Sequence, residues 1–152
     1  MSQAMKKLVL QHLECDEQLN RCEAALHKGD MAAAARNFAL FSQQLDAHFA
    51  VEEERLFPAL EKATGMFHGP TVVMRAEHAE IRNLRDEARA AISEDAAGQA
   101  LAILDTLNVL IQQHNIKEEN ILYPMCGGSI PELETVLGMN AGSTCCGACS
   151  CS

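Results

Sequence analysis

Two short segments of this chain repeat one arrangement of histidine, glutamate and proline. HFAVEEERLFPAL occupies residues 48–60, and HNIKEENILYPMC occupies residues 114–126, so His48 and His114 are 66 positions apart. The histidine and the first glutamate of each segment are four positions apart, and on a helix they would point to one face. Imidazole and carboxylate at this spacing are typical of a metal-ligand pair.

The same offset of 66 positions relates two further histidines, His12 and His78. Each precedes the histidine of its own repeated segment by 36 residues. If neighbouring helices bring these side chains together, four imidazoles and two carboxylates converge inside the protein. The predicted metal ligands are His12, His48, Glu52, His78, His114 and Glu118.

Such a cluster predicts a pair of metal ions. Buried imidazoles and carboxylates without partners cost on the order of several kcal/mol, and metal ions remove that cost. Two ions fit the internal symmetry better than one, with Glu52 and Glu118 each giving one oxygen to each ion. This donor set suits iron, manganese or zinc. An oxo or hydroxo bridge would be a fifth ligand, and a remaining open position would make the pair reactive.

Other polar residues have ordinary roles in this interpretation. His27 falls at a predicted helix end and His68 in a loop, so neither is expected to bind metal. Glu53, Glu54 and Glu119 point away from the direction of the two ligand glutamates. We expect these three to be solvated or to lie outside the ligand set.

Long helices are needed to position the ligands, and the apolar pattern supplies four. In the first, Leu8, His12, Cys15 and Leu19 share one stripe at spacings of three and four. The last is expected to break at Cys126, where two glycines follow. The predicted helices span residues 3–28, 31–58, 71–93 and 97–125, with a short helix at 131–137.

Two similar helix pairs with short links predict an all-α fold. The simplest packing is an antiparallel up-down four-helix bundle with an internal pseudo-twofold repeat. We expect the bundle to occupy residues 1–128. Residues 129–152 would then form the short helix and a flexible, cysteine-rich C-terminal tail.

The composition narrows the classes of function. The chain has 152 residues, 48% of them apolar, and a formal charge of −9. An acidic surface repels phosphate backbones, so we expect no nucleic-acid partner. No apolar run approaches the ~18 residues of a membrane span, and the N-terminus lacks the apolar run of about 7–15 residues that a secretory signal needs. We therefore expect a cytoplasmic protein whose cysteines are thiols.

Four of the seven cysteines cluster near the end of the chain, in CCGACSC. Four thiolates so close together could hold Zn or Cu(I), or pass metal or electrons to a partner. Cys15 and Cys22 lie on the apolar stripe and are expected to be core residues, while Cys126 could meet the tail. The predicted thiolate site consists of Cys145, Cys146, Cys149 and Cys151.

A ferritin-like di-iron bundle is the first alternative, but its Glu-x-x-His signature is absent. None of the residues three positions before the four histidines is acidic, so this alternative is rejected. Those residues are Val9, Leu45, Arg75 and Ile111. The sequence also has no His-Glu-x-x-His zinc-protease motif and no glycine-rich phosphate loop.

The pattern His, His-x3-Glu, His, His-x3-Glu resembles the hemerythrin-like (HHE cation-binding) family. The surrounding segments EEERLFP, GPTVVMRAEH and KEENILYP carry the resemblance, which covers roughly residues 5–126. It implies a four-helix bundle with a non-haem di-iron centre that binds oxygen, nitric oxide or peroxide-related ligands. Oxygen-carrying members have a fifth histidine where this chain has Met74. Its absence predicts a more symmetric, more open centre and argues against reversible oxygen carriage.

Three functions follow from this interpretation. The leading hypothesis is a protein that binds small oxidants, O2 or NO, in sensing or stress response. The second is iron–sulfur cluster repair, or reaction with peroxide, at the same two iron ions. The third is metal storage or transfer, with the tail as the contact for a protein or metal acceptor. The sequence does not decide between a binding protein and an enzyme.

Overall fold

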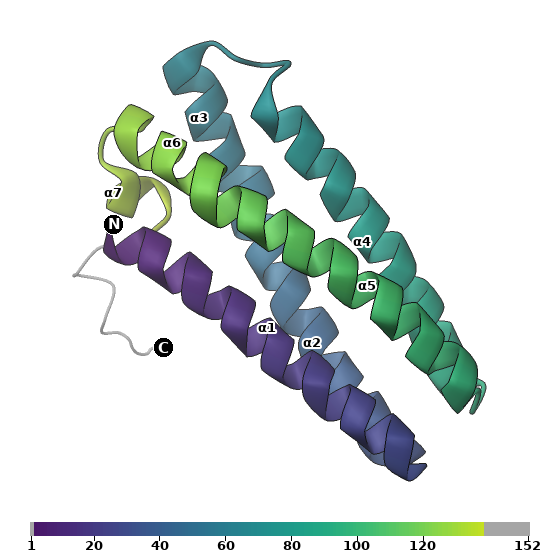
Figure 1. Ribbon diagram of the computed structural model, residues 1–152. Helices are drawn as coiled ribbons and strands as arrows, with labels where there is room; N and C mark the ends of the chain where they lie inside the picture. Colours follow the sequence, from purple (N-terminus) through teal and green to yellow (C-terminus); the bar gives the residue numbers. More distant parts are fainter. Residues whose placement is uncertain (1, 139–152) are drawn as a thin grey trace.

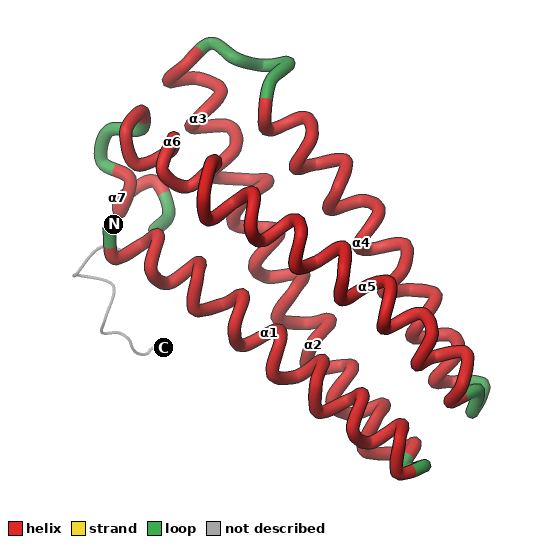
Figure 2. The backbone as a smooth tube through the Cα atoms, viewed as in Figure 1, coloured by secondary structure: helices red, strands yellow, loops and turns green. Residues whose placement is uncertain are grey.

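The computed structural model describes residues 2–138, and helices form most of this part of the chain (Figure 1). No strand occurs within residues 2–138 (Figure 2), so the predicted all-α fold is confirmed. None of these helices is long and apolar enough to cross a membrane. The helices are α1 (Gln3–Lys28), α2 (Met31–Val51), η1 (Glu52–Leu56), α3 (Phe57–Thr64), α4 (Pro70–Ser93), α5 (Ala97–Lys117), η2 (Glu118–Leu122), α6 (Tyr123–Ser129) and α7 (Leu133–Val136).

Polar caps and a glycine set the ends of the first two helices. The Ser2 side chain accepts a hydrogen bond from the backbone N–H of Met5 at the start of α1. Gly29 ends α1 with a φ of 74°, a left-handed conformation that glycine adopts without strain. Asp30 then caps α2 by accepting from the backbone N–H of Ala33. These contacts explain the tight turn that the sequence predicts here.

Two π-helical turns, η1 and η2, interrupt the long helices, and the apolar pattern does not reveal them. They begin at Glu52 and Glu118, and the residue that follows each turn donates its N–H to the carbonyl of that glutamate. A proline comes one position later in both places, Pro58 and Pro124. Because proline has no N–H and clashes with the carbonyl four residues before it, a wider turn accommodates it.

The helix that follows each π turn extends further than predicted. α3 continues past Pro58 to Thr64. α6 continues to Ser129, so the predicted break at Cys126 is wrong. Glycine lowers helix propensity by only about 1 kcal/mol, which the packing of α6 overcomes. The helix ends where Ile130 becomes extended in front of Pro131, as expected for a residue before proline.

The long helices form the predicted antiparallel bundle. α1 packs along α2, and α4 packs along α5. The turn from α1 to α2 and the turn from α4 to α5 lie at one end of the bundle, while α3, α6 and α7 lie at the other (Figure 1). The two helix pairs therefore follow the same course, as the sequence repeat predicts.

The candidate ligands lie between two separate apolar cores. The larger core includes Cys15 on α1 and Leu45 on α2, and the smaller core includes Leu8 on α1 and Leu56 on η1. His12 falls between the two core residues of α1. Apolar side chains thus cover the layer of candidate ligands from both ends of the bundle and exclude water from it.

The smaller core extends beyond the predicted boundary of the bundle at residue 128. Leu133 of α7 and Leu137 belong to it, and the backbone N–H of Ala4 donates to Glu134 Oε1 at 3.0 Å. α7 thus packs on the start of α1 and helps close this end of the bundle.

The described cysteines are core residues. Cys15, Cys22 and Cys126 are all buried and free. The contact predicted between Cys126 and the tail is not described by the structure, because the predicted thiolate site lies outside residues 2–138. That site comprises Cys145, Cys146, Cys149 and Cys151.

Candidate metal centre

The six predicted ligands meet in the middle of the bundle as two groups that share two carboxylates. Within each group, one ligand atom from each side chain lies within 4.8 Å of the others. Site A comprises His12, His48, Glu52 and Glu118, and site B comprises Glu52, His78, His114 and Glu118. None of these side chains is more than 5% exposed.

Site A is built from α1, α2 and the starts of the two π turns. His12 Nε2 lies 3.1 Å from His48 Nε2 and 3.0 Å from Glu118 Oε1. His48 Nε2 lies 3.4 Å from Glu52 Oε2. Two imidazole nitrogens and one oxygen from each carboxylate therefore face a common point.

Site B repeats this arrangement with α4 and α5. His78 Nε2 lies 3.1 Å from His114 Nε2 and 3.2 Å from Glu52 Oε1. His114 Nε2 lies 3.0 Å from Glu118 Oε2. Each shared carboxylate thus directs one oxygen to site A and the other to site B, as the sequence repeat predicts for bridging groups.

Each histidine turns its other ring nitrogen outward to a partner. Glu119 Oε2 lies 2.7 Å from His12 Nδ1, and Glu53 Oε2 lies 2.6 Å from His78 Nδ1. Because an ionised carboxylate only accepts, these Nδ1 atoms carry the hydrogen, and Nε2 points to the site. Glu53 and Glu119 were expected to be solvated or to lie outside the ligand set. Both lie outside it, and each accepts a hydrogen bond that fixes the ring of one candidate ligand histidine.

The outward partners of the other two histidines differ in charge. His48 Nδ1 lies 2.7 Å from the amide oxygen of Gln11, whereas His114 Nδ1 lies 2.8 Å from Glu77 Oε1. Gln11 and Glu77 are themselves 66 positions apart, so they are partners in the repeat. Lys117 pairs with the Glu77 carboxylate. Site B therefore has two carboxylates behind its histidines, and site A has one.

Ion pairing holds the cluster together in the metal-free protein. Burial lowers the pKa of His48, but the charge of Glu52 and hydrogen bonds with Glu118 and Glu52 outweigh it and raise the pKa to about 10. Burial likewise lowers the pKa of His78, and the two glutamates that face it raise it to about 9. Burial raises the pKa of Glu118, but the four histidines around it hold it well below its ordinary value. A metal would therefore have to displace protons from His48 and His78.

The residues fit metal ions better than they fit protons alone. Among the described residues, Glu52 Oε1 and Glu118 Oε2 are buried without a hydrogen-bond partner. Buried polar atoms of this kind are costly unless something binds them. Two imidazoles bound at right angles to one ion, with bonds of ~2.1 Å, would place their nitrogens about 3 Å apart. The nitrogen pairs of both sites lie at 3.1 Å, which matches this separation.

Tyr123, at the start of α6, is a polar residue of the site that sequence reasoning missed. Its hydroxyl donates to Glu52 Oε2 at 2.6 Å and lies 3.0 Å from Glu118 Oε1. Phe57 is its partner in the repeat, so the expected symmetry of the centre is broken here. Five positions after Glu118, a side chain on a regular α-helix would point about 140° away from it. The π turn η2 brings Tyr123 back to the ligand face.

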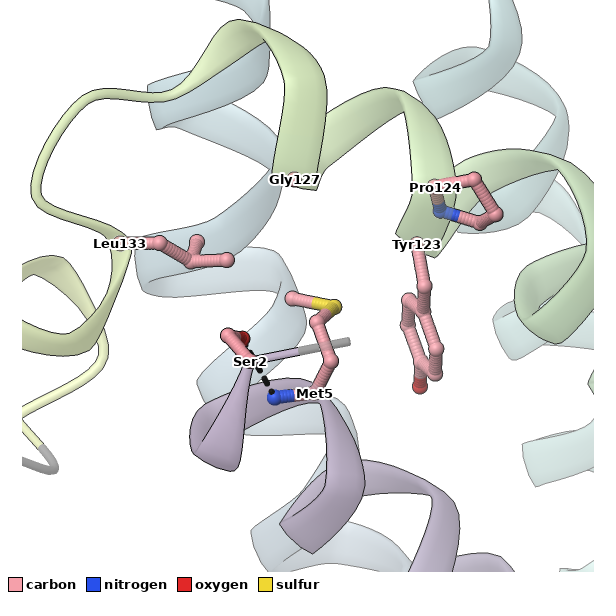
Figure 3. Close-up of a pocket in the computed structure, with 6 residues that line it drawn as sticks. All are labelled: Ser2, Met5, Tyr123, Pro124, Gly127 and Leu133. Carbon is pink, nitrogen blue, oxygen red and sulfur yellow. Dashed lines mark hydrogen bonds between the residues drawn. The ribbon is translucent and has the colours of Figure 1, made fainter.

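A cavity of about 470 Å³ lies on the other side of Tyr123. Figure 3 shows the tyrosine opposite Ser2 and Met5 of the α1 start, with Leu133 across the opening. The lining is mainly apolar, and Pro124 and Gly127 complete it. Tyr123 thus lines this cavity, and its hydroxyl reaches the carboxylates of the two sites.

The structure also places three residues that the sequence analysis left outside the ligand set. Met74, which replaces the fifth histidine of oxygen carriers, is buried in the smaller apolar core. His27 and His68 are exposed and lie apart from the two sites. The outward partners Gln11 and Glu77 were not predicted. Their position directly before a ligand histidine in each repeat was the available signal.

Comparison with known proteins identifies the class. A family model described as "Hemerythrin HHE cation binding domain" matches residues 3–126. The chain therefore belongs to the hemerythrin HHE cation-binding family, whose members bind non-haem iron, and its buried histidine–glutamate groups fit a metal site.

One curated relative has a named function. The chain is similar to "Iron-sulfur cluster repair protein YtfE" of Edwardsiella ictaluri (strain 93-146), with 34% identity over 98 residues. This match covers 58% of the present chain and 44% of the relative, so it spans less than half of that protein. No solved structure gives a significant match.

Proposed function

We propose that this protein holds two iron ions at sites A and B and binds small oxidants, O2, NO or peroxide, at this pair in sensing or stress response. The observation that carries the proposal is the sharing of Glu52 and Glu118 between two complete four-residue groups. Membership of an iron-binding family supports iron as the metal. When bound, a pair of iron ions supplies open coordination positions and one-electron chemistry.

The chain contributes orientation and exclusion of water. Glu53 and Glu119 fix the rings of His78 and His12 with Nε2 facing inward. The two apolar cores close the layer from both ends. A site of this kind admits small, weakly polar molecules more readily than hydrated ions, which supports O2 or NO as ligands.

Iron–sulfur cluster repair is the second candidate, and the similarity to the repair protein of Edwardsiella ictaluri favours it. The metal ions at sites A and B would then take part in the repair reaction. Metal storage or transfer through the tail depends on residues outside the described part and stays a prediction. So does a cytoplasmic location.

Metal analysis tests the shared premise. Protein purified without added metal and then loaded with Fe(II) without oxygen should bind two ions per chain. His48→Ala should lose binding at site A, whereas the matched control His27→Ala, at an exposed histidine, should keep both ions. A stoichiometry of one ion in the parent protein would contradict the pair.

Ligand addition then separates the two functions. A rapid change of the absorption spectrum with NO or O2, without turnover, supports a binding protein. Restored activity of an enzyme with a damaged iron–sulfur cluster, dependent on His48 and not on His27, supports repair. If the absorption spectrum of the iron-loaded protein does not change on addition of NO or O2, the first proposal is contradicted.

A further inference from the structure

The hydroxyl oxygen of Tyr123 lies close to all four side chains of site A. It is 3.3 Å from His12 Nε2 and 3.4 Å from His48 Nε2. It is also 2.6 Å from Glu52 Oε2 and 3.0 Å from Glu118 Oε1. Ligand atoms that neighbour one another around one ion, with bonds of ~2.1 Å, are separated by about 3 Å. The phenol oxygen has this separation from every candidate ligand atom of site A.

Site B has no such oxygen. The residue 66 positions before Tyr123 is Phe57, whose ring is fully buried and lies with its centroid 5.6 Å from that of His78. Phenylalanine offers no donor atom to a metal. Among the described histidines, cysteines, aspartates and glutamates, site B is formed by two imidazoles and two carboxylates, and Phe57 adds no donor to them.

We infer that Tyr123 is a fifth ligand of site A, and that the matching position of site B, beside Phe57, is the open one that receives a small exogenous ligand. This inference rests on the proposed metal pair, and it states which of the two ions binds the exogenous ligand. The protein fills one coordination position with its own oxygen and leaves the other vacant. The two ions are then inequivalent although the histidine–glutamate repeat is symmetric.

The π turns make this ligation geometrically accessible. In η2, the N–H of Tyr123 donates to the carbonyl of Glu118, five residues earlier. This hydrogen bond brings residues five apart to nearly the same face, so both side chains enter the bundle together. η1 does the same for Phe57 and Glu52, but with a side chain that cannot bind metal.

The outward contacts are consistent with the same asymmetry. Both histidines of site B donate to carboxylates, Glu53 and Glu77, whereas site A has Glu119 and the neutral amide of Gln11. Imidazoles that donate to carboxylates are stronger metal donors. Stronger imidazoles at site B would offset its missing oxygen ligand.

Metal binding would release the phenolic hydrogen. Without metal, the hydroxyl donates to Glu52 Oε2. A bound ion would take the place of this hydrogen, which leaves to solvent as it does from other metal ligands. No electron transfer is involved in this step.

The chain makes the test unusually direct, because Tyr123 is its single tyrosine and it has no tryptophan. Loading with Fe(III) should produce a visible phenolate-to-iron charge-transfer band, and resonance Raman excitation in that band should give tyrosinate vibrations. Y123F should keep two ions and native helicity and lose the band. F57Y/Y123F, which moves the hydroxyl to the site B side, should restore it.

Azide tests the open position. The parent protein should bind one azide per iron pair, and Y123F, with both positions free, should bind two. Two bound ions without tyrosinate vibrations would overturn ligation by Tyr123 while the metal pair stands. One bound ion with tyrosinate vibrations would overturn the proposed pair of ions but support Tyr123 as a metal ligand. A parent protein that binds azide as Y123F does would overturn the assignment of the open position to site B alone.

Discussion

Glu53 Oε2 accepts a hydrogen bond from Nδ1 of His78 over 2.6 Å, and this contact determines which nitrogen of the histidine can bind metal. Arg82 holds the same carboxylate through both of its oxygens, at 2.9 Å and 3.1 Å. The arginine and the histidine together keep the pKa of Glu53 below its ordinary value despite partial burial, which acts in the opposite direction. The carboxylate thus stays charged and keeps the imidazole oriented.

Glu53→Gln should therefore weaken metal binding at site B. Loss of an outer partner of a metal-bound histidine typically costs ~10–100-fold in metal affinity, and we expect a decrease in this range. Titration with Fe(II) under competition from a chelator measures it. Glu54→Gln is the matched control, because Glu54 is its exposed neighbour on the same turn. Equal affinities for the two variants would show that the contact does not support the ligand.

The metal-free protein should lose stability as the pH rises. The pKa of His48 is raised from 6.5 to about 10 and that of His78 to about 9, so the folded state holds these protons more tightly than the unfolded state. Their contribution is complete below pH 6.5 and is lost as the pH passes about 9 and about 10. The free energy of unfolding should fall by roughly a few kcal/mol over this range.

Thermal unfolding of chelator-treated protein across this pH range measures the effect. His48→Ala should flatten the dependence and His27→Ala should not. Loaded protein should show a weaker or opposite trend, because protons compete with metal for the same nitrogens. A metal-free protein that gains stability between pH 6.5 and 9 would contradict the ion-paired cluster.

The histidine–glutamate repeat was enough to predict all six residues that meet in the bundle. Spacings of four place His48 with Glu52, and the offset of 66 residues supplies the second copy without any knowledge of packing. The predicted helix starts also agree with the structure, because caps such as Asp30 are local signals. These features depend on residues close in sequence, or on the repeat itself.

Tyr123 was not predicted as part of the site, because its place depends on a π turn. A regular α-helix would point it about 140° from Glu118, and the apolar pattern contains nothing that marks an added residue in a turn. Pro124, inside an otherwise continuous helix, was the available hint. The contacts of His48 with Gln11 and of His114 with Glu77 were also not predicted, because they depend on how neighbouring helices pair, which the sequence does not specify.

The two shared carboxylates should be essential for a pair of ions. Glu52→Ala combined with Glu118→Ala removes the oxygens that reach both sites and leaves four histidines without counter-charges. We expect the number of tightly bound ions per chain to fall from two in the parent protein to none in this double variant. Glu54→Ala combined with Glu87→Ala is the control, because it also removes two glutamates, both exposed, but neither shared oxygen. Inductively coupled plasma analysis after gel filtration measures the metal, and two retained ions in the first variant would contradict the bridging geometry.

Removal of residues 143–152 should leave the metal centre intact, because all candidate ligands, the proposed Tyr123 included, lie between His12 and Tyr123. The variant should keep the helicity and the iron spectrum of the parent. It should also lose most of the rapid thiol titration. Burial raises the pKa of Cys15 to about 12, of Cys22 to about 11 and of Cys126 to about 12, so these thiols should react slowly. A full-length variant with Cys145, Cys146, Cys149 and Cys151 replaced by serine separates the loss of thiols from the loss of chain. If truncation removes the iron spectrum and the serine variant retains it, the tail supports the bundle through contacts other than its thiols, and the division near residue 128 is wrong.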